Sequence, residues 1–300
     1  MGDVDEAVRR AEAIAYVARH GTVVQRARLG ALLEGALPDE AALDAWRADR
    51  NRDGGWHAHP ADEGADHGAQ PPPRTLPATL RALGDAWEMG IGVRPEVRTG
   101  LLWVVGRQRP ADGAFVDEAP TDSGGLETGP ASRLLEAGSA RGEEERAPAL
   151  WTAAALATLD TWVSGVPAFN DARTRAYEWL CRNVQSWEDQ PPRAAWLAAS
   201  AALLRERAGS ARVSLPLAQL TMRLDDPDRT MNVRELAELV ISLVGAGLPA
   251  TEPPANLALV RLAHMQRADG ALATGNEDAV EGTLARLRAL LLVTLRVRRT

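Results

Sequence analysis

The sequence predicts an all-α protein in which pairs of helices close into a ring, an α/α toroid. Two observations lead to this prediction. Ala, Leu and Arg dominate the 300-residue chain, whereas Phe and Tyr occur only twice each. Ala, Leu and Arg favour helices, and aromatic residues are typical of strands. The second observation is a repeat, described next, and the chain is long enough to bury one large core.

Three segments share an amphipathic helix that ends in a basic or amide residue followed by Asp-Gly. They are LDAWRADRNRDGGW (43–56), LLWVVGRQRPADGAF (101–115) and VRLAHMQRADGALA (260–273). Each is followed, after a loop, by a more apolar helix. Two further helix pairs, over 173–207 and 214–247, lack the Asp-Gly signature. Such self-similarity is typical of folds in which each unit stacks on its neighbours.

The repeats place about six apolar helices in alternation with five to six amphipathic ones. The apolar helices have almost no polar face, as expected of helices that are buried all round. We therefore expect an inner barrel inside an outer layer, forming a single toroid domain over residues 1–300. Asp-Gly suits the turn after each outer helix, because glycine tolerates the left-handed conformation.

The repeated turns resemble those of the prenyltransferase and squalene–hopene cyclase superfamily, including its QW motif. The second segment matches this motif with one extra residue before the glycine, through Trp103, Val104, Gln108, Gly113 and Phe115. The other two match with substitutions, through Arg50, Gly54, Gly55 and Trp56, and through Gln266, Gly270 and Leu272. In the family these Gln and Trp side chains tie outer helices to the next turn. The resemblance implies the same structural role for Gln108, Gln266 and Trp56.

The connections predict where a pocket would open. If outer and inner helices run in opposite directions, all outer-to-inner loops lie on one rim of the ring. Two of these loops, 51–74 and 109–147, are long, and long loops in a compact domain are often functional. The connections on the opposite rim are short. We therefore expect the mouth of a pocket at the rim with the long loops.

An acidic segment on this rim, LDDPDRT, supplies the predicted catalytic residues Asp225, Asp226 and Asp228. In class II terpene cyclases, which this segment resembles, an Asp-x-Asp-Asp motif donates the proton that starts cyclisation. The spacing here is Asp-Asp-x-Asp. A carboxyl group can donate a proton only if burial or like-charged neighbours keep it protonated. The alternative interpretation is a helix N-cap cluster.

Tryptophans and arginines are the predicted substrate-binding residues. Aromatic faces stabilise cations, and arginine binds diphosphates, although the same residues also fill cores or carry surface charge. The candidates on the inner helices and at the rim are Trp87, Trp151, Trp162, Trp196, Arg74, Arg146 and Arg193.

No metal or other cofactor is predicted. A loop with His57, His59 and His67 near carboxylates could hold zinc, but we interpret it as a solvated loop. All 34 basic residues are arginine, and the absence of lysine excludes Schiff-base chemistry and a phosphate-loop lysine.

The net charge of −7 argues against nucleic acid as a partner. The single cysteine, Cys181, cannot form an internal disulfide, no apolar run is long enough to span a bilayer, and no signal peptide is evident. These features predict a cytoplasmic protein.

The resemblance implies an isoprenoid-handling enzyme similar to a class II terpene cyclase, an isomerase or lyase in one-domain form. Class II cyclases typically place the pocket between two such domains, so a partner protein could complete it here. The alternative is a non-catalytic toroid that binds an apolar ligand or a partner protein. An unrelated enzyme on the same double ring, such as a glycosidase, is a third interpretation.

Overall fold

The computed structural model describes residues 3–57, 75–117, 147–163, 165–184, 190, 192–206, 209–226, 231–272 and 278–297. Within them the chain forms α-helices, one short 3-10 helix at Pro167–Phe169 and three isolated β-bridges. The inner helices are α2 (Val23–Glu34), α5 (Leu76–Glu88), α9 (Ala147–Val163), α11 (Pro192–Arg205), α13 (Val233–Gly245) and α15 (Ala279–Val297). The outer helices are α1 (Asp3–His20), α3 (Glu40–Arg47), α6 (Pro95–Val105), α10 (Asn170–Asn183), α12 (Ala211–Asp225) and α14 (Pro253–His264).

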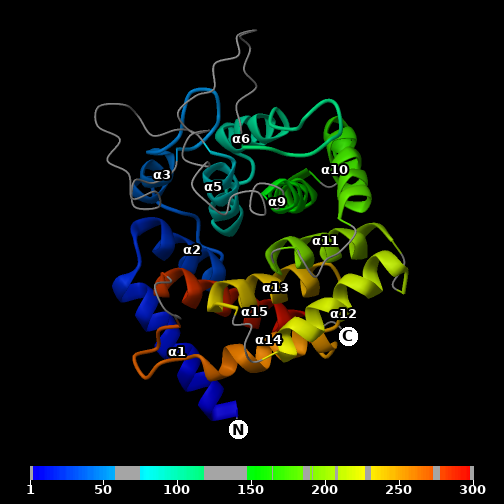
Figure 1. The fold of residues 1–300 in the computed structure, drawn as a ribbon. Coiled ribbons are helices and arrows are strands. Elements are labelled where there is room, and N and C mark those ends of the chain that lie inside the picture. The colour runs from blue at the N-terminus through cyan, green and yellow to red at the C-terminus, as the bar shows by residue number, and fades with distance from the viewer. Residues whose placement is uncertain are drawn as a thin grey trace, which may run out of the picture.

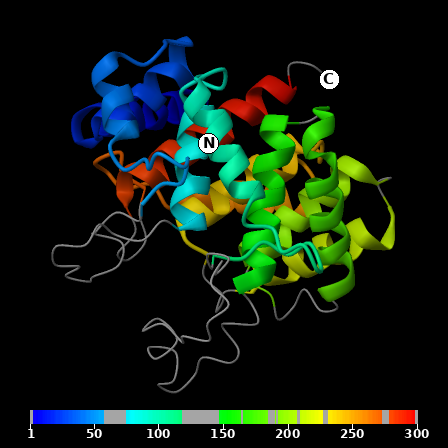
Figure 2. The same ribbon diagram turned by 90° about the horizontal axis from the view of Figure 1, so that it is seen from above.

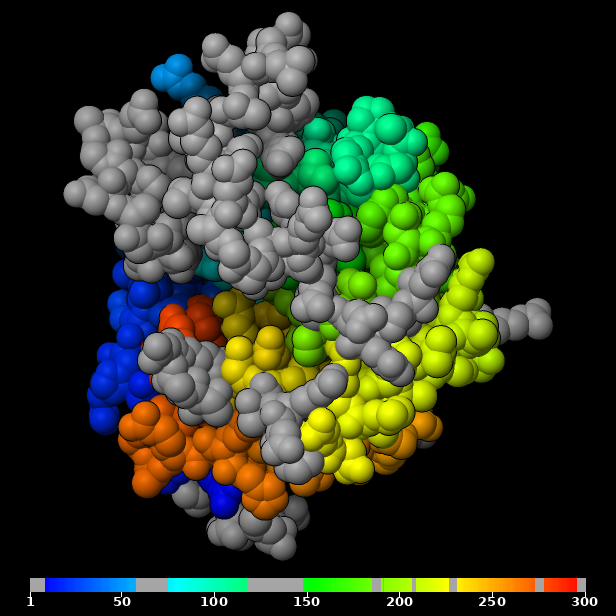
Figure 3. All heavy atoms as spheres, viewed as in Figure 1, coloured from blue at the N-terminus to red at the C-terminus, as the bar shows by residue number. Residues whose placement is uncertain are grey.

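The inner helices form a closed ring, which confirms the predicted α/α toroid (Figures 1 and 2). Going round the ring, α2 contacts α5, α5 contacts α9, and contacts continue through α11 and α13 to α15, which returns to α2. Each outer helix packs on the inner helix that precedes it in the ring, and α1 packs on α15. Figure 3 shows the outer helices α12 and α14, in yellow and orange, side by side on one face.

The core lies between the two layers, because the inner helices are apolar on most of their surface. In α13, the side chains of Leu236, Leu239 and Leu243 are fully buried. In α11, every residue from 194 to 202 is buried, since a helix of mostly alanine can approach its neighbours closely.

Three turns that follow outer helices share one geometry. In each turn, the residue that occupies the Gln position of the QW motif forms a β-bridge with the residue that occupies its Trp position. The pairs are Arg50 with Trp56, Gln108 with Phe115, and Gln266 with Leu272. The backbone N–H of the second residue of each pair donates to a buried threonine hydroxyl of the following inner helix. These bonds are Trp56 to Thr79 at 3.0 Å, Phe115 to Thr152 at 2.9 Å, and Leu272 to Thr283 at 3.0 Å.

The glutamines of two turns tie them to the next outer helix, as expected. Nε2 of Gln108 donates to the carbonyl of Ala172 on α10, and Nε2 of Gln266 donates to the carbonyl of Arg9 on α1, both at 2.8 Å. Trp56 is buried, and its indole N–H donates to the carbonyl of Trp46 at 3.1 Å. The bond from Gln266 shows that α1 completes the outer layer after α14.

The glycine of each turn packs directly against the next outer helix. Gly113 has a φ of +92°, and a Cβ atom there would lie 2.8 Å from the Cβ and carbonyl oxygen of Arg175 on α10. Gly165 has a similar φ of +83°, but a Cβ atom would meet nothing within 4 Å. Substitution of these two glycines therefore distinguishes the cost of backbone strain from the cost of a clash with α10.

We expect Gly113→Ala to lower the free energy of unfolding by about 2–5 kcal/mol, since it adds a clash with α10 to the strain of a left-handed alanine. Gly165→Ala, the matched control, should cost about 1–2 kcal/mol from strain alone. Urea unfolding of both variants measures the difference. Equal losses would show that the close approach of the turn to α10 does not matter for stability.

Candidate functional site

A single arginine of the first inner helix gathers three carboxylates inside the ring. The Arg28 side chain, on α2, is only 8% exposed. Its Nη1 lies 3.0 Å from Oδ1 of Asp85 and 2.7 Å from Oε1 of Glu281, and its Nε lies 2.7 Å from Oε2 of Glu88. Asp85 and Glu88 belong to α5 and Glu281 to α15. Charges this far from solvent require such pairing, because an unpaired buried charge is strongly destabilising.

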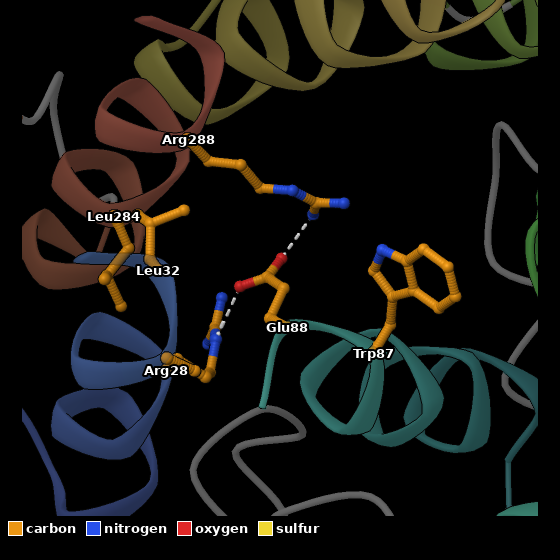
Figure 4. A pocket seen from close by; sticks show the side chains of 7 residues that line it. Arg28, Leu32, Trp87, Glu88, Leu284 and Arg288 are labelled. Atoms are coloured by element: carbon orange, nitrogen blue, oxygen red, sulfur yellow. Dashed lines mark hydrogen bonds and ion pairs between the residues drawn. The ribbon is translucent and has the colours of Figure 1, made fainter. Parts of the chain in front are cut away.

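Two further side chains extend this cluster. Arg288, which also belongs to α15, forms an ion pair with Oε1 of Glu88, so that Glu88 is held between two guanidinium groups (Figure 4). Nε2 of Gln25 on α2 donates to Oε1 of Glu281 at 2.8 Å. The cluster therefore joins α2, α5 and α15.

Charged side chains of α13 face the same interior. Arg234 acts on the pKa of Asp85, although α13 and α5 are not neighbours in the ring. Nε of Arg234 bonds Oε1 of Glu238 at 2.8 Å, and the other oxygen of Glu238 lies 3.2 Å from Nε of Arg193 on α11. The Asp85 carboxyl group therefore lies within electrostatic reach of Arg28 on α2, Glu281 on α15 and Arg234 on α13.

The environment moves the pKa values of two carboxyl groups in this cluster apart. Desolvation is the largest influence on Asp85; the charge of Arg28 opposes it, the charges of Glu281 and Glu88 add to it, and the pKa is raised to about 6. For Glu281, burial also raises the pKa, but Arg28 and the hydrogen bond from Gln25 outweigh it and leave the pKa lowered. Asp85 thus keeps its proton at mildly acidic pH while Glu281 stays ionised. Such a separation is typical of acid–base sites.

A cavity of about 230 Å³ adjoins the cluster. It lies toward the C-terminal ends of α2 and α5, since Trp87 and Glu88 are the last residues of α5. We expected a pocket mouth at the opposite rim. Most of the two long loops of that rim lies outside the described residues. The cavity is lined by Arg28, Ala31, Leu32, Trp87, Glu88, Leu284 and Arg288 (Figure 4).

The predicted acidic segment lies elsewhere. Asp225 is the last residue of the outer helix α12, with an exposed side chain, and Asp226 follows it, half-buried. Asp228 lies outside the described residues. The Asp225 side chain is therefore open to solvent.

The alternative interpretation of this segment, an N-cap, is wrong for Asp225 and Asp226, because α13 is capped by Asn232. Oδ1 of Asn232 accepts from the N–H of Glu235 at 2.8 Å, and the Glu235 side chain accepts from the N–H of Asn232 at 3.0 Å.

Of the predicted substrate-binding residues, Trp87 alone lines the cavity just described. Its side chain is 44% exposed and contacts Trp162 edge to face, with ring centroids 5.0 Å apart. Trp151 is half-buried, whereas Trp196 is fully buried and packs in the core. Arg193, at the start of α11, is paired with Glu238. Arg74 and Arg146 lie outside the described residues.

Among the described residues there is no group of three or more side chains that could bind a metal ion. One nitrogen of His57, Nε2, contacts Oδ1 of Asn51 at 3.0 Å. His59 and His67 lie outside the described residues, so the predicted zinc alternative falls on a segment about which the structure says nothing.

Sequence reasoning missed Arg28, Asp85, Glu88 and Glu281. A signal was available for three of them, because Asp85, Glu88 and Glu281 are charged residues within helices predicted to be buried all round. Charges in such helices are functional or structural by necessity, since they need partners. Asp85 and Glu88 are also spaced three residues apart, which places them on one helix face.

Two solved structures are similar to the whole chain. One is a protein from Actinoplanes, with 15% sequence identity and a TM-score of 0.59, matched over 96% of this chain and 99% of that one. The other is the type II terpene cyclase MstE from Scytonema in its apo form, with 12% identity and a TM-score of 0.55, matched over 97% of this chain and 98% of that one. The fold is terpenoid cyclase-like.

No protein-family model matches the sequence, and no curated protein matches it either. None of the helices in the described part of the chain is both long and apolar enough to cross a membrane.

The raised pKa of Asp85 predicts how stability depends on pH. The folded protein binds this proton up to about pH 6, whereas the unfolded chain releases it near its ordinary value of 3.8. Wild-type stability should therefore fall as pH rises between these two values. Asp85→Asn carries no titrating group, so its stability relative to wild type should improve by about 1–3 kcal/mol between pH 4 and pH 7.5.

Urea unfolding of both proteins at a series of pH values measures this difference. Asp44→Asn, which changes a carboxylate that is 71% exposed, is the control and should show no such trend. A stability difference between Asp85→Asn and wild type that is constant across this range would contradict the assignment.

Proposed function

We propose that the protein is an isoprenoid-handling enzyme that resembles a class II terpene cyclase and starts cyclisation by proton transfer from Asp85. The observation that carries this proposal is the Asp85 carboxyl group, which lies 3.0 Å from Nη1 of Arg28 between inner helices of a terpenoid cyclase-like fold and has its pKa raised to about 6. A carboxyl group that is protonated near neutral pH can act as a general acid.

The reaction needs no oxidant or cofactor. The O–H bond of Asp85 breaks and a C–H bond forms on the less substituted carbon of an alkene, which leaves a tertiary carbocation. Further double bonds of the substrate attack this cation in turn, and a proton is finally lost, so that the net change is an isomerisation. The Arg28 guanidinium, 3.0 Å from the Asp85 carboxylate, stabilises the negative charge left behind.

The walls of the ring suit a hydrocarbon substrate. The described parts of α9 and α11 carry few charges. Among them, Nη2 of Arg205 on α11 pairs with Oδ1 of Asp160 on α9 at 2.6 Å. Such walls exclude water, which would otherwise quench a carbocation. The exposed face of Trp87 can stabilise a positive charge.

The size of the chain supports the proposal. This chain matches the type II terpene cyclase MstE over 98% of its length, so one ring of this size is enough for a protein of that class. We therefore propose that the reaction takes place in this one ring, without a second domain or partner chain.

A second candidate function is non-catalytic binding of an apolar ligand or a partner protein. The exposed side chain of Asp225 favours it, because the segment that resembles the cyclase acid motif is not arranged as an acid. Asp225, Asp226 and Asp228 stay in the proposal as the competing position for the proton donor.

Incubation with farnesyl and geranylgeranyl diphosphate and the corresponding alcohols, followed by product analysis, tests the proposal. Asp85→Asn should lower kcat about 10²–10⁴-fold, the usual contribution of a general acid. Asp226→Asn should retain most activity and Asp44→Asn all of it, with thermal unfolding as the check on folding.

Two outcomes would contradict this assignment. Loss of activity in Asp226→Asn but not in Asp85→Asn would move the acid to the end of α12. Binding of polyprenyl substrates without turnover of any of them would favour the non-catalytic function.

The pH dependence of kcat provides an independent prediction. Because the active form of Asp85 is protonated, kcat should be level below pH 5 and fall about tenfold per pH unit well above pH 6. A rate that rises through pH 6 would identify a general base instead.

A further inference from the structure

The cavity between α2, α5 and α15 is large enough for a small ligand and has a mixed lining. It has room for several water-sized groups, at about 30 Å³ each, within its volume of about 230 Å³. In Figure 4, Glu88 lies between the guanidinium groups of Arg28 and Arg288, and the indole of Trp87 stands on the far side of Glu88. One part of the lining is thus charged and the rest is apolar.

The charged part offers hydrogen-bond donors, and both oxygens of its one carboxylate already accept from arginines. Both oxygens of Glu88 are occupied, Oε2 by Nε of Arg28 at 2.7 Å and Oε1 by Nη1 of Arg288. Within the described residues, Nε and Nη2 of Arg288 make no hydrogen bond, and this side chain is 29% exposed. A guanidinium with two such N–H groups matches the oxygens of a carboxylate or a phosphate.

Arg288 is the cation that the lining offers to a ligand. Arg28 also lines the cavity, but its charge is balanced by Asp85, Glu88 and Glu281, which all pair with it. Arg288 pairs with one carboxylate, Glu88. An anionic head group in the cavity would therefore bind Arg288 in competition with Glu88 alone.

The apolar part of the lining, which exposes less surface than the polar part, can contact a short hydrocarbon chain. It consists of Ala31, Leu32 and Leu284, from α2 and α15, together with Trp87. Trp87 is 44% exposed, so it has surface left to cover. Burial of apolar ligand surface against these side chains would add affinity without requiring a further polar partner.

We propose that this cavity binds an amphipathic anion, with a carboxylate or phosphate head on Arg288 and a short apolar chain against Leu32 and Leu284. This inference goes beyond the proposed function, because it requires neither proton transfer from Asp85 nor turnover. It names the class of ligand from the donors and apolar walls of the cavity alone.

Isothermal titration calorimetry with four ten-carbon probes tests the proposal on the whole chain. Geranic acid and geranyl phosphate should bind, whereas geraniol and geranylamine should bind at least tenfold more weakly. The anion that binds more tightly identifies the preferred head group, and a preference for either anion supports the proposed site.

Arg288→Gln removes the proposed contact and should weaken binding of both anions by about 10- to 100-fold, the effect of a lost charge-assisted hydrogen bond. Arg98→Gln is the matched control, because it removes the charge of an exposed arginine on the outer helix α6. A second variant, Leu32→Phe, keeps both arginines and fills the apolar part, and it should weaken binding of both anions. Thermal unfolding verifies that each variant folds.

The proposal is overturned if geraniol or geranylamine binds as tightly as geranic acid, if neither anion binds, or if Arg288→Gln retains wild-type affinity. Since calorimetry detects binding without turnover, a negative cyclisation assay does not affect this test. Absent anion binding in a protein that cyclises isoprenoids would overturn this inference alone.

Discussion

The pairing of one buried guanidinium with three carboxylates is the constraint on which the interior of this ring depends. Arg28 stands on the first inner helix, Asp85 and Glu88 on the second and Glu281 on the last. Without Arg28, three carboxylates would lie close together with little solvent around them. Removal of one partner of a buried ion pair typically destabilises the folded protein by about 3–5 kcal/mol. The same pairing closes the ring and separates the pKa values of Asp85 and Glu281.

The repeated turns explain why these side chains can meet. Each of three turns docks on the next outer helix through its glycine and bonds the following inner helix through a buried threonine, namely Thr79, Thr152 or Thr283. Two of those inner helices, α5 and α15, carry the carboxylates around Arg28. The turns thus help to set the rotation of these helices about their own axes, and this rotation brings their carboxylates to Arg28. Fold and candidate site follow from the same local contacts.

The fold was predictable because its signals are local and repeated. Apolar helices alternate with amphipathic ones along the chain, and the Asp-Gly turns mark the end of three outer helices, so the double ring could be derived from spacing alone. The roles of Gln108 and Gln266 followed from the resemblance of these turns to a known repeat, and their bonds to α10 and α1 agree with it.

The candidate site was not predictable in the same way, because its members are far apart in sequence. Arg28 and Glu88 are separated by 60 positions and Arg28 and Glu281 by 253. Which faces meet depends on the rotation of each inner helix, and no pattern within one helix fixes that rotation. The segment at Asp225 attracted attention because it resembles a motif, but α12 extends to Asp225 and Asn232 caps the next helix, which leaves Asp225 exposed.

The central claim is that the inner ring of helices holds a carboxyl group with a pKa of about 6, and titration of this group tests the claim most directly. NMR of protein labelled with ¹³C at the aspartate carboxyl carbon, with Asp85→Asn to assign the resonance, gives the midpoint for this one group. The account predicts a midpoint near pH 6 for Asp85. A midpoint close to the ordinary value of 3.8 would contradict it, because Asp85 would then be an ionised partner of Arg28 with no proton to donate.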